Sequence, residues 1–485
     1  MNRLLVIAHV LGGLLMVFSA TFALPLAWSL AVRDGAHLSF LSSALICLTA
    51  GTLLWASTRR YRREIEPRDG PLLVVLGWVS MTVAATVPLR LEIPHLSSTD
   101  AFFEAMAGLT TTGATILTGI EFLPESVNIW RHALQWYGGM GIIVMAVAIL
   151  PILGVGGMQL FNAEMPGPMK ESKLTPRITQ TAKYLWLIYI VLTVACIGAL
   201  RMAGLSWFDS VCHGFSALGL GGFSNRDANV SAFDSPLVEG ILVVFMLVAV
   251  LNFATHFRAL RARSLRPYLK DAEAPRILAL LLGSSVAIGA FLYWKGQYET
   301  LGEALRHALF NTVSLGTSTG YMSQDYAAWP VFAPMWMLFL ACISSSAGST
   351  GGGIKMIRAL ILVRQSGREL VRMVHPRAIA PLCVSGQIVE NKVIFAVLGY
   401  MLLWGATQVI LTFAMMASGL DFISSFSAVV AAVNCLGPAL GHFGPTSNYA
   451  SLTDLQTWLL AFGMLAGRLE LLTFFVVLTP AFWRR

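Results

Sequence analysis

Long apolar segments dominate this sequence. Ten of them approach or exceed the roughly 17–25 residues with which a helix crosses a bilayer. They cover residues 4–31, 38–57, 71–90, 130–154, 181–202, 236–257, 275–294, 330–362, 393–418 and 455–482, and the eighth is interrupted. Only 12% of the 485 residues are charged, about half the share in soluble domains. The chain is therefore predicted to be an all-α integral membrane protein, and a soluble fold is excluded.

Clusters of Lys and Arg determine the predicted orientation. They follow the second, fourth, sixth and eighth apolar segments, and Arg484 and Arg485 end the sequence. If ten helices alternate in direction, all of these clusters lie on one side of the membrane. The positive-inside rule identifies that side as cytoplasmic. Both termini are therefore expected in the cytoplasm.

Four shorter segments resemble one another. They lie near residues 100–113, 207–222, 303–320 and 421–437, and each is long enough only to enter the membrane and return. The glycines near their ends are Gly113, Gly222, Gly320 and Gly437. Spacings of 109, 98 and 117 residues indicate an internal repeat of about a hundred residues. Each unit is predicted to contain a spanning helix, a re-entrant helix, a glycine turn and a second spanning helix.

The four glycine turns have the chemistry of a cation pathway. Non-helical backbone at membrane depth is stable only where protein covers it or where it lines a wet cavity. A helix that runs inward ends with free carbonyls and negative dipole character, so four such ends favour a cation. Glycine permits a positive φ and leaves no Cβ in the pore. Carbonyls of the turns can then replace an ion's hydration shell.

Several longer motifs resemble one family. They are GLTTTGAT at 108–115, GGMGII at 138–143, LPILGVGGMQ at 150–159, EMPGP at 164–168, AGSTGGGIK at 347–355 and GRLE at 467–470. Over essentially the whole chain they resemble the TrkH family, the membrane subunits of bacterial Trk potassium uptake systems in the Trk/Ktr/HKT superfamily. The resemblance implies uptake of potassium and rubidium across the bacterial inner membrane by a homodimer, with a cytoplasmic nucleotide-binding partner, TrkA.

The resemblance also implies an architecture of four pseudo-symmetric parallel repeats around one pore. The expected divisions are an N-terminal two-helix unit at 1–66 and repeats at 67–162, 163–268, 269–375 and 376–485, the third with a broken second helix.

The same resemblance places the selectivity filter on twelve residues. They are Thr111, Thr112, Gly113, Leu220, Gly221, Gly222, Ser318, Thr319, Gly320, Cys435, Leu436 and Gly437. Glycine at all four key positions points to potassium, because serine at the first one accompanies sodium transport in some plant members of the superfamily. The only metal expected is potassium in this filter, and no cofactor is expected on the chain.

The eighth apolar segment is broken by the run SSSAGSTGGG at 344–353. Each glycine costs about 1 kcal/mol in a helix interior, so a glycine triplet should interrupt the helix. Arg468 lies 31 residues after Gly437, and the same offset from Gly320 falls on Gly351, inside this run. Arg468 is therefore expected level with the broken segment, bonded to its carbonyls or hydroxyls. Glu470 is expected to balance the charge of Arg468.

This arrangement predicts an intramembrane gate, a role that the family resemblance supports. Its expected residues are Ser346, Ala347, Gly348, Ser349, Thr350, Gly351, Gly352, Gly353 and Arg468. Below it, Lys355 and Arg358 are expected to extend toward the membrane interface. Candidate docking surfaces for the soluble partner are the basic segments 164–180, 258–276 and 364–378.

Two other functional classes deserve comparison. The run GSTGGGIK at 348–355 fails as a phosphate-binding loop, because Ile354 separates the last glycine from the lysine and Met356 replaces Ser or Thr. An enzyme is therefore not expected. A secondary potassium transporter coupled to protons or sodium remains the alternative, with Glu104 and Glu470 as the nearest candidate carriers. The parallel sense of the repeats favours a channel-like pore over the inverted repeats of such transporters.

Overall fold

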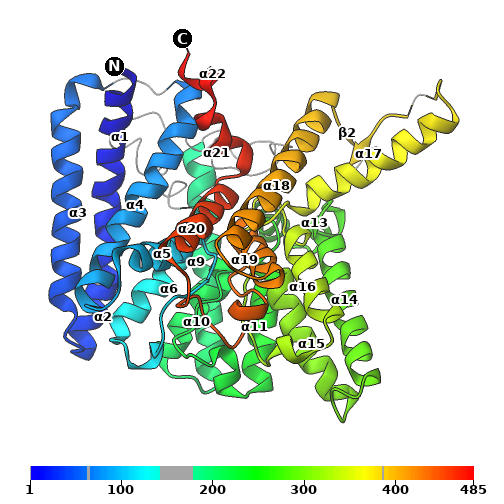
Figure 1. Ribbon diagram of the computed structural model, residues 1–485, viewed down its shortest axis with the longest axis horizontal. Helices are drawn as coiled ribbons and strands as arrows, with labels where there is room; N and C mark the ends of the chain where they lie inside the picture. Colours follow the sequence, from blue (N-terminus) through cyan, green and yellow to red (C-terminus); the bar gives the residue numbers. More distant parts are fainter. Residues whose placement is uncertain (1, 63–65, 142–177, 379, 385–386, 485) are drawn as a thin grey trace.

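The computed structural model describes residues 2–62, 66–141, 178–378, 380–384 and 387–484. It is a bundle of helices with both chain ends at the same end of the molecule (Figure 1). Within the described residues, six helices are long and apolar enough to cross a membrane by themselves. They are α1 (Asn2–Ser19) continued by α2 (Ala23–Val32), α3 (His37–Ser57), α4 (Gly70–Glu92), α9 (Ile178–Met202), α14 (Ala274–Trp294) and α18 (Asn391–Ala417). The predicted multi-pass membrane protein is confirmed.

Two further predicted spans are bent. The helix α11 (Pro236–Ala249) meets α12 (Phe253–Ala262) at 94°, and α20 (Asp454–Arg468) meets α21 (Leu471–Leu478) at 115°. The prediction of one continuous helix over each of 236–257 and 455–482 is therefore wrong in the second half of each.

Local contacts explain both bends. The Asn252 side chain accepts a hydrogen bond from the Ala254 N–H at 2.7 Å and so begins α12 as a new helix. Glu470 has φ of 56°, which ends α20 and redirects the chain into α21.

The predicted break in the eighth span is confirmed. The helix α16 (Phe332–Ile343) ends where the serine-rich and glycine-rich run begins, and α17 (Met356–Val374) begins after it. We call residues 344–355 between them the intramembrane loop. Of the fourth predicted span, the structure describes α6 (Glu125–Gly139) and the following residues to 141. The motifs at 150–159 and 164–168, and most of the docking candidate 164–180, lie outside the described residues.

Four short helices occupy the predicted re-entrant segments. They are α5 (Ser98–Leu109), α10 (Trp207–Gly219), α15 (Leu301–Gly316) and α19 (Phe422–Asn434). Each begins at a side-chain cap, in which an oxygen accepts a bond from the backbone N–H three residues later. The capping residues are Ser97, Ser206, Thr300 and Asp421. The same local chemistry thus begins all four helices.

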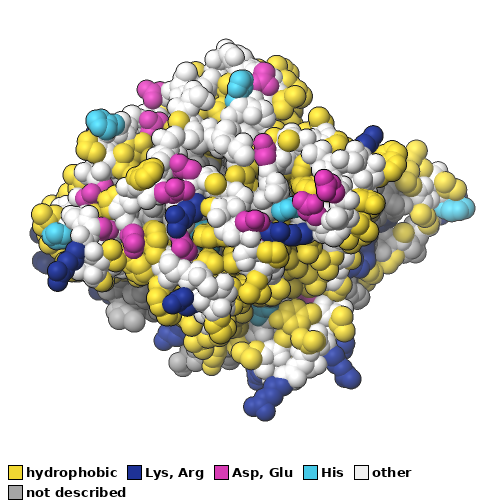
Figure 2. Space-filling view, turned by 90° about the horizontal axis from the view of Figure 1, so that it is seen from below, with side chains coloured by type: hydrophobic (Ala, Val, Ile, Leu, Met, Phe, Trp, Pro, Cys, Tyr) yellow, Lys and Arg dark blue, Asp and Glu magenta, His cyan; other side chains and the backbone are white. Residues whose placement is uncertain are grey.

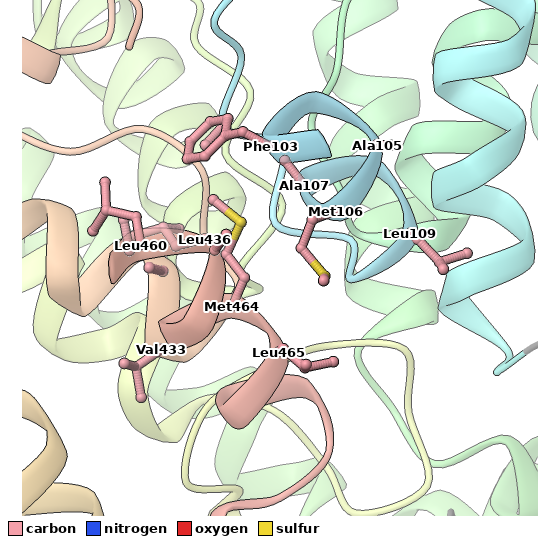
Figure 3. Packing of buried hydrophobic residues seen from close by; sticks show 14 of the residues in the cluster. Phe103, Ala105, Met106, Ala107, Leu109, Val433, Leu436, Leu460, Met464 and Leu465 are labelled. Atoms are coloured by element: carbon pink, nitrogen blue, oxygen red, sulfur yellow. The ribbon is translucent and has the colours of Figure 1, made fainter. Parts of the chain in front are cut away.

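The first and last of these units pack against each other. Figure 3 shows Phe103 and Met106 of α5 facing Leu460 and Met464 of α20, with Leu436 between them. All five side chains are buried. Because lipid is as apolar as these side chains, close packing rather than exclusion of water stabilises such a contact. This contact brings the first unit beside the last one.

The remaining elements are short. They are α13 (Arg266–Lys270), α22 (Pro480–Trp483), the antiparallel strands β1 (Cys383–Val384) and β2 (Gln387–Ile388), and the 3₁₀ turns η1 (Ala20–Phe22), η2 (Arg59–Tyr61), η3 (Pro67–Asp69), η4 (Ile120–Phe122), η5 (Asn229–Phe233), η6 (Tyr326–Ala328) and η7 (Gly441–Phe443). The C-terminal part of α17 and the segment after it extend beyond the body of the molecule (Figure 1).

Candidate cation pathway

The backbone takes the same shape after each short helix. The φ values of Gly113, Gly222, Gly320 and Gly437 are 78°, 73°, 87° and 91°. Two residues earlier, Thr111, Leu220, Ser318 and Cys435 have φ values of 57°, 54°, 60° and 53°. The positive φ at the glycines was predicted from the sequence. The positive φ two residues earlier was not predicted, because four different L-residues adopt it and residue type gives no signal there.

Each of the four glycines lies against a carbonyl of the next segment. A Cβ added to Gly113 would lie 1.8 Å from the Gly221 carbonyl oxygen, and a Cβ added to Gly222 would lie 1.9 Å from that of Thr319. A Cβ added to Gly320 would lie 2.3 Å from the Leu436 carbonyl oxygen, and a Cβ added to Gly437 would lie 2.6 Å from that of Thr112. The oxygen belongs in every case to the residue before the next glycine, and the fourth segment contacts the first. These contacts join the four segments in a closed ring. We call this the glycine ring.

A glutamine of α6 supports one part of the glycine ring. Gln135 Nε2 donates to the Gly221 carbonyl at 2.7 Å, and its Oε1 accepts from Ser216 Oγ at 2.6 Å and from the Phe223 N–H at 3.2 Å. Its side chain is fully buried. Gln135 was not predicted as a functional residue, although it is a polar side chain within the apolar segment 130–154.

A buried ion pair lies beside the ring. Arg131 and Glu104 are 2.8 Å apart, with side chains 1% and 0% exposed. Glu104 also accepts bonds from the Thr115 hydroxyl and the Ile116 N–H, both at 3.0 Å, and Arg131 donates to the Ser224 carbonyl at 3.3 Å. The pair connects the chain that follows Gly113 with the chain that follows Gly222. Glu104, a candidate carrier in the alternative of coupled transport, therefore serves as the partner of an arginine.

Breaking this pair is expected to destabilise the protein strongly. Glu104→Ala leaves the Arg131 guanidinium buried without its counter-charge, which typically costs about 3–5 kcal/mol. We expect a clear fall in the thermal unfolding midpoint in detergent, measured by loss of the monodisperse peak after heating. Lys392→Ala removes one partner of the exposed pair Lys392–Glu390, 2.6 Å apart, and should leave the midpoint unchanged. Equal midpoints for the two variants would contradict this assignment.

The intramembrane loop lies directly against the ring. The Gly352 N–H donates to Ser318 Oγ at 2.9 Å, and a Cβ added to Gly352 would lie 2.0 Å from the Asn434 carbonyl oxygen. Lys355 Nζ donates to the Gly351 carbonyl. The Thr350 hydroxyl donates to the Leu218 carbonyl at 3.0 Å. The centre of the loop thus touches the last turns of the second, third and fourth re-entrant segments.

Arg468 contacts both the loop and the ring. Its Nη1 donates to the Thr350 carbonyl at 3.0 Å and to Thr111 Oγ1 at 3.2 Å. Its Nη2 donates to the carbonyls of Gly138, at the end of α6, and of Gly139, the latter at 3.0 Å. The predicted contact between Arg468 and a carbonyl of the broken segment is therefore present.

The predicted surroundings of Arg468 need two corrections. Glu470 pairs with Arg358 at 2.6 Å rather than with Arg468, because the turn at Glu470 directs its side chain toward α17. Lys355 and Arg358 do not extend to the interface. They are 5% and 4% exposed and are held by the Gly351 carbonyl and by Glu470. Burial is possible because each cation has a carbonyl or carboxylate partner.

The arrangement offers oxygen donors rather than metal-binding side chains. No group of three or more His, Cys, Asp or Glu residues that could hold a metal ion occurs in the described part of the chain. The ring brings together backbone carbonyls and the C-terminal ends of four helices, which suits a dehydrated monovalent cation as the transported substrate. All twelve predicted filter residues lie in its four segments. The predicted gate residues fall into two groups. Those at the centre of the loop lie against the ring, and Ser346 to Gly348 lie against α11, α12 and the start of α14.

Comparison with known proteins identifies the family. A family model described as TrkH, cation transport protein, matches residues 36–484. The Trk system potassium uptake proteins TrkH of Salmonella typhimurium and Vibrio parahaemolyticus are 44% and 43% identical, over 479 and 485 residues, and each alignment covers 99% of both chains. The crystal structure of the potassium transporter TrkH from Vibrio parahaemolyticus matches with a TM-score of 0.89 and 40% identity, covering 99% of this chain and 100% of that chain. The resemblance predicted from the sequence motifs is thereby confirmed, and this chain belongs to the TrkH family of cation transport proteins.

Proposed function

We propose that this chain takes up potassium, and rubidium with it, across the bacterial inner membrane through a pore lined by the glycine ring. The observation that carries the proposal is the ring itself, in which four segments with the same backbone shape contact one another in order. Relatives that are named potassium uptake proteins support the choice of ion.

The proposed pore has four pseudo-symmetric repeats at 67–162, 163–268, 269–375 and 376–485, after an N-terminal unit at 1–66. The breaks in the second helices support this division. Asn252, Gly351 and Arg468 lie 30, 31 and 31 residues after Gly222, Gly320 and Gly437. Chain breaks at matching depths are expected when repeats of one design surround one axis.

Acidic side chains support the proposed direction of uptake. Figure 2 shows Asp and Glu side chains on the face opposite the chain ends. Exposed Asp227 and Asp234 lie in the connection between α10 and α11, and exposed Asp325 lies between α15 and α16. Carboxylates at the outer mouth would raise the local concentration of cations. Both termini are then proposed to be cytoplasmic, in accord with the basic clusters of the sequence.

The intramembrane loop is proposed to be the gate. It lies against the base of the glycine ring, where it fills the space that an ion must cross to reach the cytoplasm. Arg468 bonds to the loop and adds a positive charge at the same depth. The barrier to a cation then has a steric part and an electrostatic part.

The proposed assembly is a homodimer controlled by a cytoplasmic TrkA-like nucleotide-binding subunit. The helix α17 is the proposed route of control, because it begins directly after the loop and carries Arg364, Arg368 and Arg372. A force on α17 would be transmitted along a continuous helix to the loop.

Charge reversal on α17 is expected to abolish control by the partner. In Arg364→Glu/Arg368→Glu/Arg372→Glu, we expect stimulation of rubidium flux by the partner to fall at least about tenfold, since like charges across an interface are strongly unfavourable. Flux without the partner should keep its preference for potassium over sodium. The matched control is Arg261→Glu/Arg263→Glu/Arg266→Glu on the neighbouring basic segment. Stimulation lost only in this control would place docking there instead.

The proposed function is tested by flux into proteoliposomes that contain this chain alone. Rubidium uptake driven by membrane potential, competed by potassium and weakly by sodium, is the expected result. Uptake that requires an imposed proton or sodium gradient would instead establish a coupled secondary transporter. Absence of uptake in both conditions, with a monodisperse protein, would contradict an independent pore.

A further inference from the structure

Glu273 occupies an unusual position for an acidic side chain. It directly precedes α14 and is only 5% exposed, at the end of a membrane-spanning helix. It takes no part in the glycine ring. The sequence places it within the basic segment 258–276, where an acid would ordinarily be read as a surface residue.

The Glu273 carboxylate bonds to the intramembrane loop and to the helix that follows it. It accepts from Ser346 Oγ at 2.7 Å and from the Ala347 N–H at 3.1 Å and 3.2 Å, near the beginning of the loop. It also accepts from the Ile357 N–H at 2.9 Å, in the first turn of α17. The first N–H groups of a helix have no partner within the helix, so an acceptor placed there stabilises the turn. One side chain therefore connects α14, the loop and the helix that leaves the loop.

The same part of the loop is bonded to the bend between α11 and α12. The Ser346 N–H donates to the Val250 carbonyl, and the Phe253 N–H donates to the Gly348 carbonyl, both at 3.1 Å. The bend frees these main-chain groups, and the loop provides their partners. Glu273 and the bend thus hold the beginning of the loop, while Arg468 holds its centre.

We propose that Glu273 is a positioning residue of the gate, which holds the beginning of the intramembrane loop and the first turn of α17 together in the closed arrangement. The inference rests on the gate proposed above. In the closed state the loop is then attached at two points, Arg468 and Glu273. Glu273 is the one nearer the cytoplasm, and it lies next to α17, the helix through which a partner would act. Displacement of α17 would draw the Ile357 N–H away from the carboxylate, so that this attachment is released first.

Protonation of Glu273 gives the proposal a second measurable consequence. Burial raises the pKa of its carboxyl from 4.5 to about 7, against the opposing effect of its hydrogen bonds. In the open state water would reach the carboxyl, and its pKa would return toward the ordinary value. A proton then binds more tightly to the closed state, so acidification favours closure and alkalinisation favours opening. Between pH 6 and pH 8, flux is expected to rise by up to about tenfold.

Other charged and titratable groups surround this carboxylate. Asp271 on the same segment and Lys355 and Arg358 at the beginning of α17 interact with it directly, and Arg258 and His256 on α12 interact with Asp271. His256 bonds to Tyr268 and to the Val248 carbonyl rather than to the loop. Its substitution is therefore a control for the pH profile.

The experiment measures rubidium flux without partner in proteoliposomes, from pH 6 to pH 8. Glu273→Ala removes both the attachment and the titration, so we expect its flux at pH 6 to rise several-fold and its pH dependence to flatten. Glu273→Gln resembles the protonated carboxyl, so its flux should stay near the wild-type value at pH 6 across the whole range. Glu273→Asp, which keeps an ionisable carboxylate on a shorter side chain, should retain part of the pH dependence. Glu303→Gln, an exposed acid on α15, and His256→Gln should both keep the wild-type profile.

Two results would overturn the inference and are distinguishable. If Arg468→Ala raises flux but Glu273→Ala has wild-type flux and a wild-type pH profile, the gate stands and Glu273 is only structural. If neither variant raises flux, the gate assignment itself fails. Ser346→Ala replaces Glu273→Ala if the latter does not fold, because it removes one donor and leaves the carboxylate in place. It should raise flux less than Arg468→Ala, and wild-type flux in Ser346→Ala would contradict the proposal.

Discussion

Gly222→Ala is expected to reduce potassium flux strongly while the protein still reaches the membrane. The added Cβ would lie 1.9 Å from the Thr319 carbonyl oxygen, far inside the contact distance of two atoms. The φ of 73° adds about 1–2 kcal/mol for any L-residue. The Thr319 carbonyl must move, and it belongs to the proposed filter. A displaced carbonyl no longer replaces the hydration shell of the ion, so we expect at least about a tenfold loss of flux.

The four glycines allow a graded test of this argument. The distance from an added Cβ to the nearest carbonyl oxygen increases from 1.8 Å at Gly113 and 1.9 Å at Gly222 to 2.3 Å at Gly320 and 2.6 Å at Gly437. The loss of rubidium flux in the alanine variants should decrease in the same order. Gly437→Ala should therefore retain the most activity.

Two control glycines separate collision from backbone strain. Gly296 has φ of 70° but nothing within 4 Å of an added Cβ, and Gly283 has neither a positive φ nor a neighbour. Gly296→Ala should lower stability slightly and leave the preference for potassium unchanged, and Gly283→Ala should change neither. A Gly222→Ala protein with wild-type flux would remove the glycine ring from the pathway.

Local sequence signals predicted the parts of the fold that depend on local chemistry. The four short helices were predicted from short segments that end at glycine turns, and the structure adds that each begins at a residue type that caps helices: Ser97, Ser206, Thr300 and Asp421. The glycine-rich run at 344–353 predicted the intramembrane loop, since glycine disfavours helix at any site. Repeat spacing also predicted the depth of Arg468 within one residue, Gly351 being expected and Thr350 being found.

The missed features depend on contacts between distant residues. At the bend at 250–252, the Val250 carbonyl accepts from the Ser346 N–H and the Phe253 N–H donates to the Gly348 carbonyl. These partners lie about a hundred residues later in the chain, and no local pattern contains that information. Glu470 was assigned to Arg468 because they are neighbours in the chain, whereas its partner Arg358 is 112 residues away. Glu273 and Gln135 were missed for the same reason. Each of them bonds backbone groups of a distant segment, and only the folded chain shows which backbone groups need such a partner.

Removal of the Arg468 side chain is expected to produce the largest gain of flux. Arg468→Ala loses the bonds to Thr350, Thr111 and Gly139 together, and it removes a positive charge from the proposed path of a cation. We expect potassium flux without partner to rise on the order of tenfold, the factor that corresponds to a barrier lowered by about 1.4 kcal/mol. The measurement is rubidium uptake in proteoliposomes, with Arg60→Ala in the exposed connection after α3 as the control for a lost charge.

Arg468→Lys separates the two parts of the barrier. Lysine keeps the positive charge, but its single ammonium cannot reproduce the planar set of donors with which the guanidinium contacts the loop and α6 together. If attachment of the loop closes the pore, Arg468→Lys should conduct nearly as well as Arg468→Ala. If the charge alone opposes the ion, Arg468→Lys should remain closed like the wild type. We expect an intermediate flux nearer to that of Arg468→Ala, because four contacts from one guanidinium hold a loop that is otherwise rich in glycine.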